Sequence, residues 1–363
     1  MANEIDINEN DLLLQYPVVL QTLLRDHSRF AHLREQLRRE GKDPKDAEGR
    51  EDECHIIWAT DNYEPFGEGF LFHDQITIDH ITGEYSMIVR PRVSKTQAEQ
   101  TQRSKDMAEV FTPSWICNAQ NNLVDDAWFG RSNVFNTEYT SENGEHLWTP
   151  SEDKIQFDND NEERSWQAYV KDTRMEMTCG EAPYLVSRYD TVSGQPIPVS
   201  HRIGLLDRKL RVISENVDNK AEWIKMAKTA LKSIYGFEWQ GDNLLLAREA
   251  VFYTIIDYYK EKFGEEPPKR SLPGLAYIIS WNLWQMDGLK MVIPDTCHED
   301  IVVTTSLFGD DERIVTPCQG CKTGDIRLHN GIKCRVRDWS YTGKIWDKGR
   351  PYFYTLLNNK TQL

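Results

Sequence analysis

The chain has 363 residues, 39% of them hydrophobic, and a formal net charge of −15. This length is sufficient for a large core with one or two domains. The acidic balance argues against generic electrostatic binding to nucleic acid, which depends on neutralised phosphates, although it leaves room for a local basic groove. No apolar run approaches the roughly 20 residues that span a bilayer, and the acidic start MANEIDINEND lacks a secretory pattern. We therefore expect a cytoplasmic protein with no membrane partner.

The residue pattern changes twice in the first part of the chain. Residues 10–40 alternate apolar and charged positions at helical spacing and are followed by the polar linker GKDPKDAEGREDE. From residue 55 the chain shows short β-like runs, HIIWAT, FLFHDQITIDHI and YSMIVRPRV. The segment AEVFTPSWICNAQNNLVDDAWF predicts a loop at FTP and then a helix, and residues 130–165 are acidic and rich in loop-forming residues.

A regular alternation follows. MEMTC is typical of a strand, PYLVSRY of a helix start, SIYGFEW of a strand, NLLLAREAVFYTIIDYYKEKF of a long buried helix and LAYIIS of a strand. Strands that alternate with helices indicate an α/β fold with a parallel sheet. We expect three consecutive parts: an accessory α/β region at 1–105, a cofactor and catalytic domain at 106–297, and a β-rich segment at 298–363.

Two features of this alternation suggest a nucleoside cofactor. The turn Cys179-Gly180 follows the first strand, and Glu238 ends the second. Glycine lets a backbone approach a ligand closely, and an acid at the end of the next strand receives ribose hydroxyls. The alternative is a plain strand-ending turn and a solvated acid.

Three elements, in order, resemble those of the N6-adenine DNA methyltransferases of restriction-modification systems, specifically their modification subunits. AEVFTPSW resembles the element that lies against the methionine part of S-adenosylmethionine, and MEMTCGEAPYL resembles the family's acid-P-x-C-G-x-G-x-F-L loop. YGFEWQGDNLLLAREA resembles a strand-to-helix join whose acid binds the ribose and whose next residue packs on the adenine. The resemblance, over roughly 107–294, implies these cofactor residues: Phe111, Thr112, Pro113, Glu176, Cys179, Gly180, Glu238 and Trp239.

The same resemblance implies a Rossmann-like sheet of the S-adenosylmethionine-dependent methyltransferase type. The chain departs from the family's loop at Met177, which replaces a proline, and at Ala182, which replaces a glycine.

The catalytic motif of the family is more altered. Its N/D-P-P-Y/F loop accepts hydrogen bonds from the adenine amino group and stacks on the flipped base, whereas this chain has SWNLWQMDGLK without either proline. Asn282 or Asp287 could accept from the amino group, and Trp284 could stack on the base. The alternative is an aromatic core segment in a protein without transfer activity. A rival candidate, Asp61-Asn62-Tyr63 after HIIWAT, would require a permuted motif order.

The seven cysteines are odd in number and mostly scattered, so we do not expect a disulfide framework. Cys54, Cys117 and Cys297 are interpreted as single buried thiols. The spacing Cys318-x2-Cys321-x7-His329-x4-Cys334 predicts a structural Zn²⁺ site, because zinc favours four tetrahedral thiolate and imidazole ligands. The alternative is two buried thiols and a surface histidine.

A basic cluster lies at 202–211, RIGLLDRKLR. Its arginines could meet phosphate or could extend over an apolar helix face.

These observations predict a DNA adenine-N6 methyltransferase that transfers a methyl group from S-adenosylmethionine to a base in DNA. Its partner would be DNA, with a specificity or restriction subunit as a further partner. Two competing predictions are an inactive methyltransferase-fold binding module in a DNA-processing complex and a same-fold enzyme acting on RNA or a modified base.

Overall fold

The computed structural model describes residues 8–106, 112–158, 161–305 and 311–357. The chain folds into two compact units, and each unit is built from separated segments. The first unit comprises Met1–Leu24, Thr77–Gly236 and Asp242–Leu283. The second unit comprises Arg25–Ile76, Phe237–Gly241 and Trp284–Leu363. The units therefore do not follow the three consecutive parts expected from the sequence.

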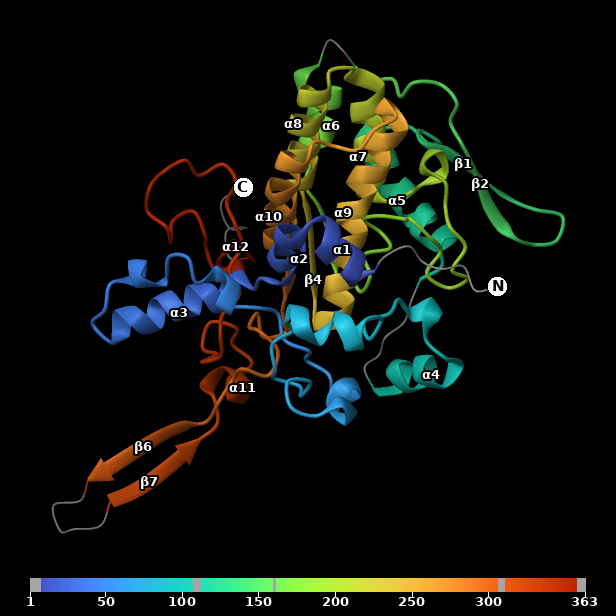
Figure 1. Cartoon of the computed structure of the whole chain (residues 1–363). Helices are drawn as coiled ribbons and strands as arrows, with labels where there is room; N and C mark the ends of the chain where they lie inside the picture. The colour runs from blue at the N-terminus through green and yellow to red at the C-terminus, as the bar shows by residue number, and fades with distance from the viewer. Residues whose placement is uncertain (1–7, 107–111, 159–160, 306–310, 358–363) are drawn as a thin grey trace. The chain divides into compact units, whose positions relative to one another are not determined.

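The first unit is largely helical. Helix α10 packs against α2 and α8, while α6, α7 and α8 contact one another (Figure 1). The helices with residues in this unit are α1 (Glu9–Gln15), α2 (Pro17–Leu24), α4 (Gln97–Asp106), α5 (Ser114–Phe129), α6 (Trp166–Lys171), α7 (Leu205–Asn216), α8 (Lys220–Leu231), α9 (Gly241–Phe263) and α10 (Leu272–Asn282). Its 3-10 helices are η4 (Ile78–His80), η5 (Gly83–Tyr85), η6 (Arg92–Ser94), η7 (Glu162–Arg164), η8 (Val199–His201) and η9 (Lys269–Ser271).

The second unit has a small core around helix α3 (His27–Arg39). The buried side chains of Phe30, Leu37, Ala47 and Cys54 pack together, with Trp346 against them. The other helices of this unit are α11 (Gln319–Thr323), α12 (Phe353–Leu357), η1 (Pro44–Ala47), η2 (Glu51–Glu53) and η3 (Asp61–Phe66).

One sheet is small and parallel, with the strand order β3-β4-β5. Its strands are β3 (Arg174–Met177), β4 (Ile234–Glu238) and β5 (Leu283–Gln285). Two antiparallel ribbons accompany it. They are β1 (Asn136–Thr140) with β2 (His146–Pro150), and β6 (Asp300–Thr305) with β7 (Asp311–Thr316). The expected mixed α/β class is therefore confirmed.

Side-chain caps explain where several helices begin. The carboxylate of Asp26 accepts hydrogen bonds from the backbone N–H groups of Ser28 and Arg29 at the start of α3. Asn219 caps α8 in the same way. Such caps satisfy donors that have no partner within the helix. The predicted strands at 174–177 and 234–238 and the predicted helices α5 and α9 are confirmed.

Three predicted elements are wrong. The run LAYIIS belongs to helix α10, which is buried on most sides, and a short apolar run does not distinguish a buried helix from a strand. Residues 183–189 form no helix: 183–185 are a turn, and Tyr189 forms an isolated bridge with Pro196. The N–H groups of Leu205 and Leu206, at the start of α7, bind the carbonyl oxygens of Tyr184 and Leu185, which a helix would have used itself. The β-like runs between 55 and 93 form 3-10 helices and isolated bridges such as Ile57 with Gln75.

Candidate functional site

The turn after β3 is closed by an acid of the strand itself. Glu176 is buried, and its carboxylate accepts hydrogen bonds from the N–H groups of Tyr184 at 3.4 Å and Leu185 at 3.2 Å. Within the turn, Thr178, Gly180 and Ala182 all have positive φ, at 53°, 53° and 63°. A β-branched residue rarely adopts this conformation, so the turn is locally strained. Glu176 thus holds the turn shut around Gly180.

The thiol of Cys179 faces inward from this turn. It is 1% exposed, and a Cβ added at Gly236 of β4 would lie only 3.2 Å from its sulfur. The pair explains why a glycine stands in the middle of β4.

The end of β4 carries the predicted ribose-binding acid. Glu238 is buried, and its Oε1 accepts a hydrogen bond from the N–H of Gln240 at 3.3 Å. The indole N–H of Trp239 donates to the carbonyl oxygen of Ala59 at 3.1 Å. Helix α9 begins two residues later, at Gly241. The strand, the acid and the helix N-terminus therefore follow one another within a few residues.

The FTP element is only partly described. Phe111 lies outside the described residues, whereas Thr112 and Pro113 directly precede α5. The carbonyl oxygen of Thr112 accepts a hydrogen bond from the hydroxyl of Thr191 at 3.0 Å. The N–H of Ser114 donates to the carboxylate of Asp190 at 2.7 Å. This part of the chain is thus fastened to the segment 190–191.

The three candidate catalytic side chains are buried and have structural partners. The amide nitrogen of Asn282 donates to the carbonyl oxygens of Leu231 at 2.8 Å and Ile234 at 3.0 Å. Trp284 packs on the ring of Phe237 and points its N–H at the sulfur of Met286. The three side chains are each at most 5% exposed.

The carboxylate of Asp287 stabilises a tight turn by binding backbone N–H groups and is not left open to accept from a substrate amino group. Its Oδ1 accepts hydrogen bonds from the N–H groups of Leu289 at 2.9 Å and Lys290 at 3.1 Å. The side chain of the neighbouring Gln285 pairs with both backbone groups of Ile57 at 2.9 and 2.8 Å. This segment is thus fixed by backbone contacts within the second unit.

The rival candidate at 61–63 lies in η3. Tyr63 is buried, and its ring packs on Trp58 with centroids 4.2 Å apart, so its aromatic face is used in the core.

A Cys/His cluster is brought together in the second unit. The ligand atoms of Cys297, Cys318, Cys321 and His329 all lie within 4.8 Å of one another, and the group could hold a metal ion. His329 Nδ1 lies 3.4 Å from the sulfur of Cys297, 3.7 Å from that of Cys318 and 3.6 Å from that of Cys321. The imidazole is therefore roughly equidistant from the three thiols.

The fourth member of the cluster differs from the predicted one. Cys334 is not in the group; it is fully buried, and its Sγ lies 3.4 Å from the carbonyl oxygen of Gln285. Cys297, interpreted from the sequence as a single buried thiol, takes its place. The reason is the β6–β7 ribbon, whose paired strands return the chain from residue 300 to residue 316. Antiparallel pairing thus brings a cysteine before the ribbon beside one after it.

The loop around Cys318 favours a thiolate. Burial opposes ionisation, but hydrogen bonds from the N–H groups of Cys321 and Asn330 outweigh it and lower the pKa of the Cys318 thiol to about 6. Only a glycine fits at position 320 without a clash, since an added Cβ would lie 2.5 Å from the backbone N of His329 and 2.6 Å from its ring. Thiolates are the form of cysteine that binds metals.

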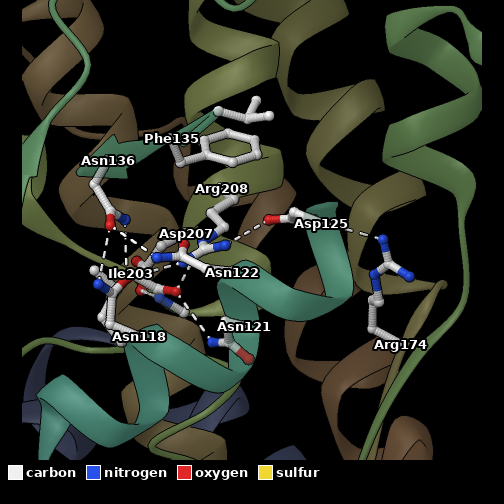
Figure 2. Close-up of polar contacts among 12 residues, drawn as sticks. Asn118, Asn121, Asn122, Asp125, Phe135, Asn136, Arg174, Ile203, Asp207 and Arg208 are labelled. Atoms are coloured by element: carbon white, nitrogen blue, oxygen red, sulfur yellow. Dashed lines mark hydrogen bonds and ion pairs between the residues drawn. The ribbon is translucent and has the colours of Figure 1, made fainter. Parts of the chain in front are cut away.

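Sequence reasoning missed a buried polar cluster in the first unit (Figure 2). The guanidinium of Arg208 donates to Asp125 at 2.6 Å, Asn122 at 2.7 Å and Asn118 at 3.0 Å. The amides of Asn118 and Asn136 exchange hydrogen bonds at 2.9 and 2.8 Å. The sequence contains a pattern that could have indicated this cluster: the polar residues at positions 118, 121, 122 and 125 share one face of a helix.

The structure shows what the basic side chains of the segment 202–211 contact. Arg208 and Lys209 are almost completely buried and bind groups of the protein itself. Arg202 pairs with Asp257 at 2.8 Å, and Arg211 pairs with Glu215 at 2.7 Å. Arg202, Arg208 and Arg211 thus form internal ion pairs, whereas Lys209 donates to the carbonyl oxygen of Val170 and to the hydroxyl of Ser233. Neither of the two predicted uses describes Arg208.

No family model, curated protein or solved structure matches the chain. Among the helices that the described residues form, none combines the length and apolarity needed to cross a lipid bilayer.

Proposed function

We propose that the chain binds S-adenosylmethionine and transfers its methyl group to the N6 of adenine in DNA. The observation that carries this proposal is the buried Glu238 at the end of β4, followed directly by the N-terminus of α9. An acid in this position of an α/β unit receives ribose hydroxyls. When bound, the cofactor supplies an electrophilic methyl group on a sulfonium.

The turn after β3 supports the same proposal. Gly180 has no side chain to obstruct a ligand, and Glu176 keeps the turn closed through two backbone N–H groups. Strained positive-φ residues persist where the surrounding structure enforces them, and they cluster at ligand-binding sites. Within the first unit, Gly180 would leave the backbone of the turn open to a ligand. Within the second unit, Glu238 would bind the ribose and Trp239 would present an apolar face to the adenine.

A second function, a cofactor-binding module without transfer activity, is favoured by one observation. The amide nitrogen of Asn282 already donates to two backbone carbonyl oxygens, and the side chain is 1% exposed. An enzyme that acts on a flipped base needs this loop to open toward the base. The two functions differ in methyl transfer and share cofactor binding.

The experiment is a binding measurement combined with a product assay. Purified full-length protein is titrated with S-adenosylmethionine and then incubated with DNA, which is digested and analysed for N6-methyladenine by mass spectrometry. We expect Glu238→Ala to weaken cofactor binding at least tenfold, whereas Glu265→Ala, at a 54% exposed side chain, should leave it unchanged.

Binding without any methylated product would establish the non-catalytic module. No binding by the wild-type protein would contradict both functions.

We also infer that Cys297, Cys318, Cys321 and His329 bind one structural Zn²⁺. Tetrahedral zinc with Zn–S of about 2.3 Å and Zn–N of about 2.05 Å places the nitrogen about 3.6 Å from each sulfur. The 3.4, 3.6 and 3.7 Å separations in the protein fit this geometry. With four protein ligands, no coordination position would remain for a substrate.

Metal analysis of three proteins tests this inference. We expect about one zinc per chain in the wild type, as tetrahedral coordination by four protein ligands requires, and a large loss in Cys297→Ser. Cys334→Ser is the matched control, because Cys334 is a buried thiol of the same unit outside the cluster. Equal zinc loss in both variants, or none in the wild type, would contradict this ligand set.

A further inference from the structure

A hollow of about 340 Å³ in the first unit is lined by aromatic side chains of α5 and of the β1–β2 ribbon. Its volume lies at the lower end of the range of about 300–1,000 Å³ typical of small-molecule sites. Trp115, His146 and Trp148 line it together with the polar side chains of Asn118 and Glu138. None of these residues takes part in the cofactor and metal sites proposed above.

The aromatic rings of the hollow are already ordered. The rings of Trp115 and His146 stack with centroids 4.1 Å apart and planes 19° from parallel. The N–H of Trp148 is held by the carbonyl oxygen of His201 at 2.8 Å. Trp115 is nevertheless 37% exposed, so its indole remains accessible to a ligand. A preoriented ring loses little conformational entropy when another planar group stacks on it.

The register of the ribbon selects which side chains face α5. Glu138 lies opposite Trp148, and Thr140 lies opposite His146. Side chains two residues apart on a strand share a face, so Glu138 and Thr140 are on the same face as Asn136. Asn136 binds Asn118 of α5 (Figure 2). The face that carries Glu138 and Trp148 is therefore the one turned toward α5, and Tyr139 and Leu147 also border the hollow.

The polar floor of the hollow is rigid. Asn118 is fixed by Asn136 and Arg208, as Figure 2 shows. Asn122 donates one hydrogen bond to Oε1 of Glu138. A carboxylate has about four lone-pair sites and can accept further hydrogen bonds. Glu138 is thus held in place by the protein and retains capacity to accept from the amino group of a ligand.

The charge of the hollow indicates which part of a ligand it contacts. Among the described residues that line it there is no lysine or arginine, and Glu138 is acidic. A phosphate would find no cationic partner there. A planar heterocycle would find a stacking surface, and its exocyclic amino group would find a carboxylate acceptor.

We propose that this hollow binds an unstacked, amino-bearing nucleobase of single-stranded DNA, where the choice of DNA rests on the proposed function and the choice of base on the lining of the hollow. The base stacks on Trp115 and donates its amino hydrogen to Glu138. This site goes beyond the proposed methyl transfer, because it uses none of the residues assigned to the cofactor.

The test measures binding of short labelled oligomers to the full chain by fluorescence anisotropy. An oligomer with adenines in a thymine background should bind more tightly than an all-thymine oligomer, and an abasic oligomer should bind least. Trp115→Ala should weaken binding about 5- to 150-fold, the range expected for one base–aromatic stack. Trp115→Phe should retain most of it, and Leu123→Ala, at an exposed position of α5, should have no effect.

Glu138→Gln should reduce the preference for adenine over thymine without abolishing binding. Affinity should fall only weakly with added salt, because the hollow contributes no cation to counterion release. Unchanged binding by Trp115→Ala, or equal binding of the abasic oligomer, would overturn the proposal. Competitive displacement by S-adenosylmethionine would also overturn it, since the hollow would then be the cofactor pocket.

The failures of the two proposals are distinguishable. A wild-type protein that binds the oligomers but no S-adenosylmethionine leaves this site intact and removes the proposed methyl transfer. If the wild-type protein binds the cofactor but Trp115→Ala leaves oligomer binding unchanged, the nucleobase site is contradicted and the proposed methyl transfer stands.

Discussion

At the scale of single residues, Arg208 is a buried charge of the first unit with several polar partners. It is 1% exposed and pairs with Asp125 at 2.6 Å. We expect Arg208→Met to lower the free energy of unfolding by up to about 3–5 kcal/mol, because it removes the cation nearest to the buried carboxylate of Asp125 and leaves the guanidinium of Arg174 at 3.6 Å. Urea unfolding measures the loss.

Lys225→Met is the control for Arg208→Met. Lys225 pairs with Glu222 in the open, with 73% of its side chain exposed, and such pairs contribute under about 1 kcal/mol. A loss in Arg208→Met as small as that in the control would contradict a stabilising role for the buried cluster.

Lys209 predicts a pH dependence. Burial, with a contribution from the charge of Arg174, lowers the pKa of its amine to about 7 from the usual 10.5. Between these values the unfolded chain binds more protons than the folded one, so stability rises with pH, by at most about 1.4 kcal/mol per pH unit. Lys209→Met should remove this rise in urea unfolding measured from pH 7 to 10. Parallel pH profiles of the two proteins would contradict it.

The metal cluster shows which ligands can be predicted from the spacing of residues in the sequence. Cys318, Cys321 and His329 lie close enough along the chain for their proximity to follow from sequence. Cys297 precedes Cys318 by a whole ribbon, so its proximity depends on the pairing of Asp300 with Thr316. Spacing alone favours Cys334 as the fourth ligand, because it is closer to His329 in sequence than Cys297 is. In the structure, the thiol of Cys334 is instead buried in the core.

At the scale of elements, strands and helices with strong local signals were predictable. Helix α9 is long and β4 is rich in aromatic and β-branched residues, and both are confirmed. The segment Leu272–Asn282 was ambiguous, because its apolar residues are buried on most sides and show no clear period. Its helical state depends on distant partners, which a local pattern does not contain.

Arg248 is one of these partners. Its guanidinium donates to the carbonyl oxygens of Leu283 at 2.9 and 2.7 Å and Ser280 at 3.1 Å, at the C-terminal end of α10. Arg248→Met should lower the free energy of unfolding by more than about 2 kcal/mol, since each buried carbonyl left without a donor costs about 1–3 kcal/mol. Lys260→Met, at a half-exposed position of the same helix, is the control. Equal stability of the two variants would exclude this role of Arg248.

At the scale of the whole molecule, the interleaving of the two units could not be predicted. Composition changes along the chain suggest consecutive domains, whereas the chain passes between the units at residues 24, 76, 236, 241 and 283. These crossings fall beside or within regular elements, including β4 and β5, where no Pro- or Gly-rich linker marks a boundary. Only interactions between residues far apart in the sequence reveal them.

This organisation predicts a local response to metal removal. Binding of a structural metal contributes to folding free energy, and all four candidate ligands belong to the second unit. After chelation, hydrogen exchange should accelerate in β6, β7 and α11, whereas amides of α7, α8 and α10 in the first unit should keep their protection. Mass spectrometry of peptides from both units measures this, with chelator-treated Cys297→Ser as the control that should show no further change. Accelerated exchange in the first unit as well would mean that the two units unfold as one cooperative structure.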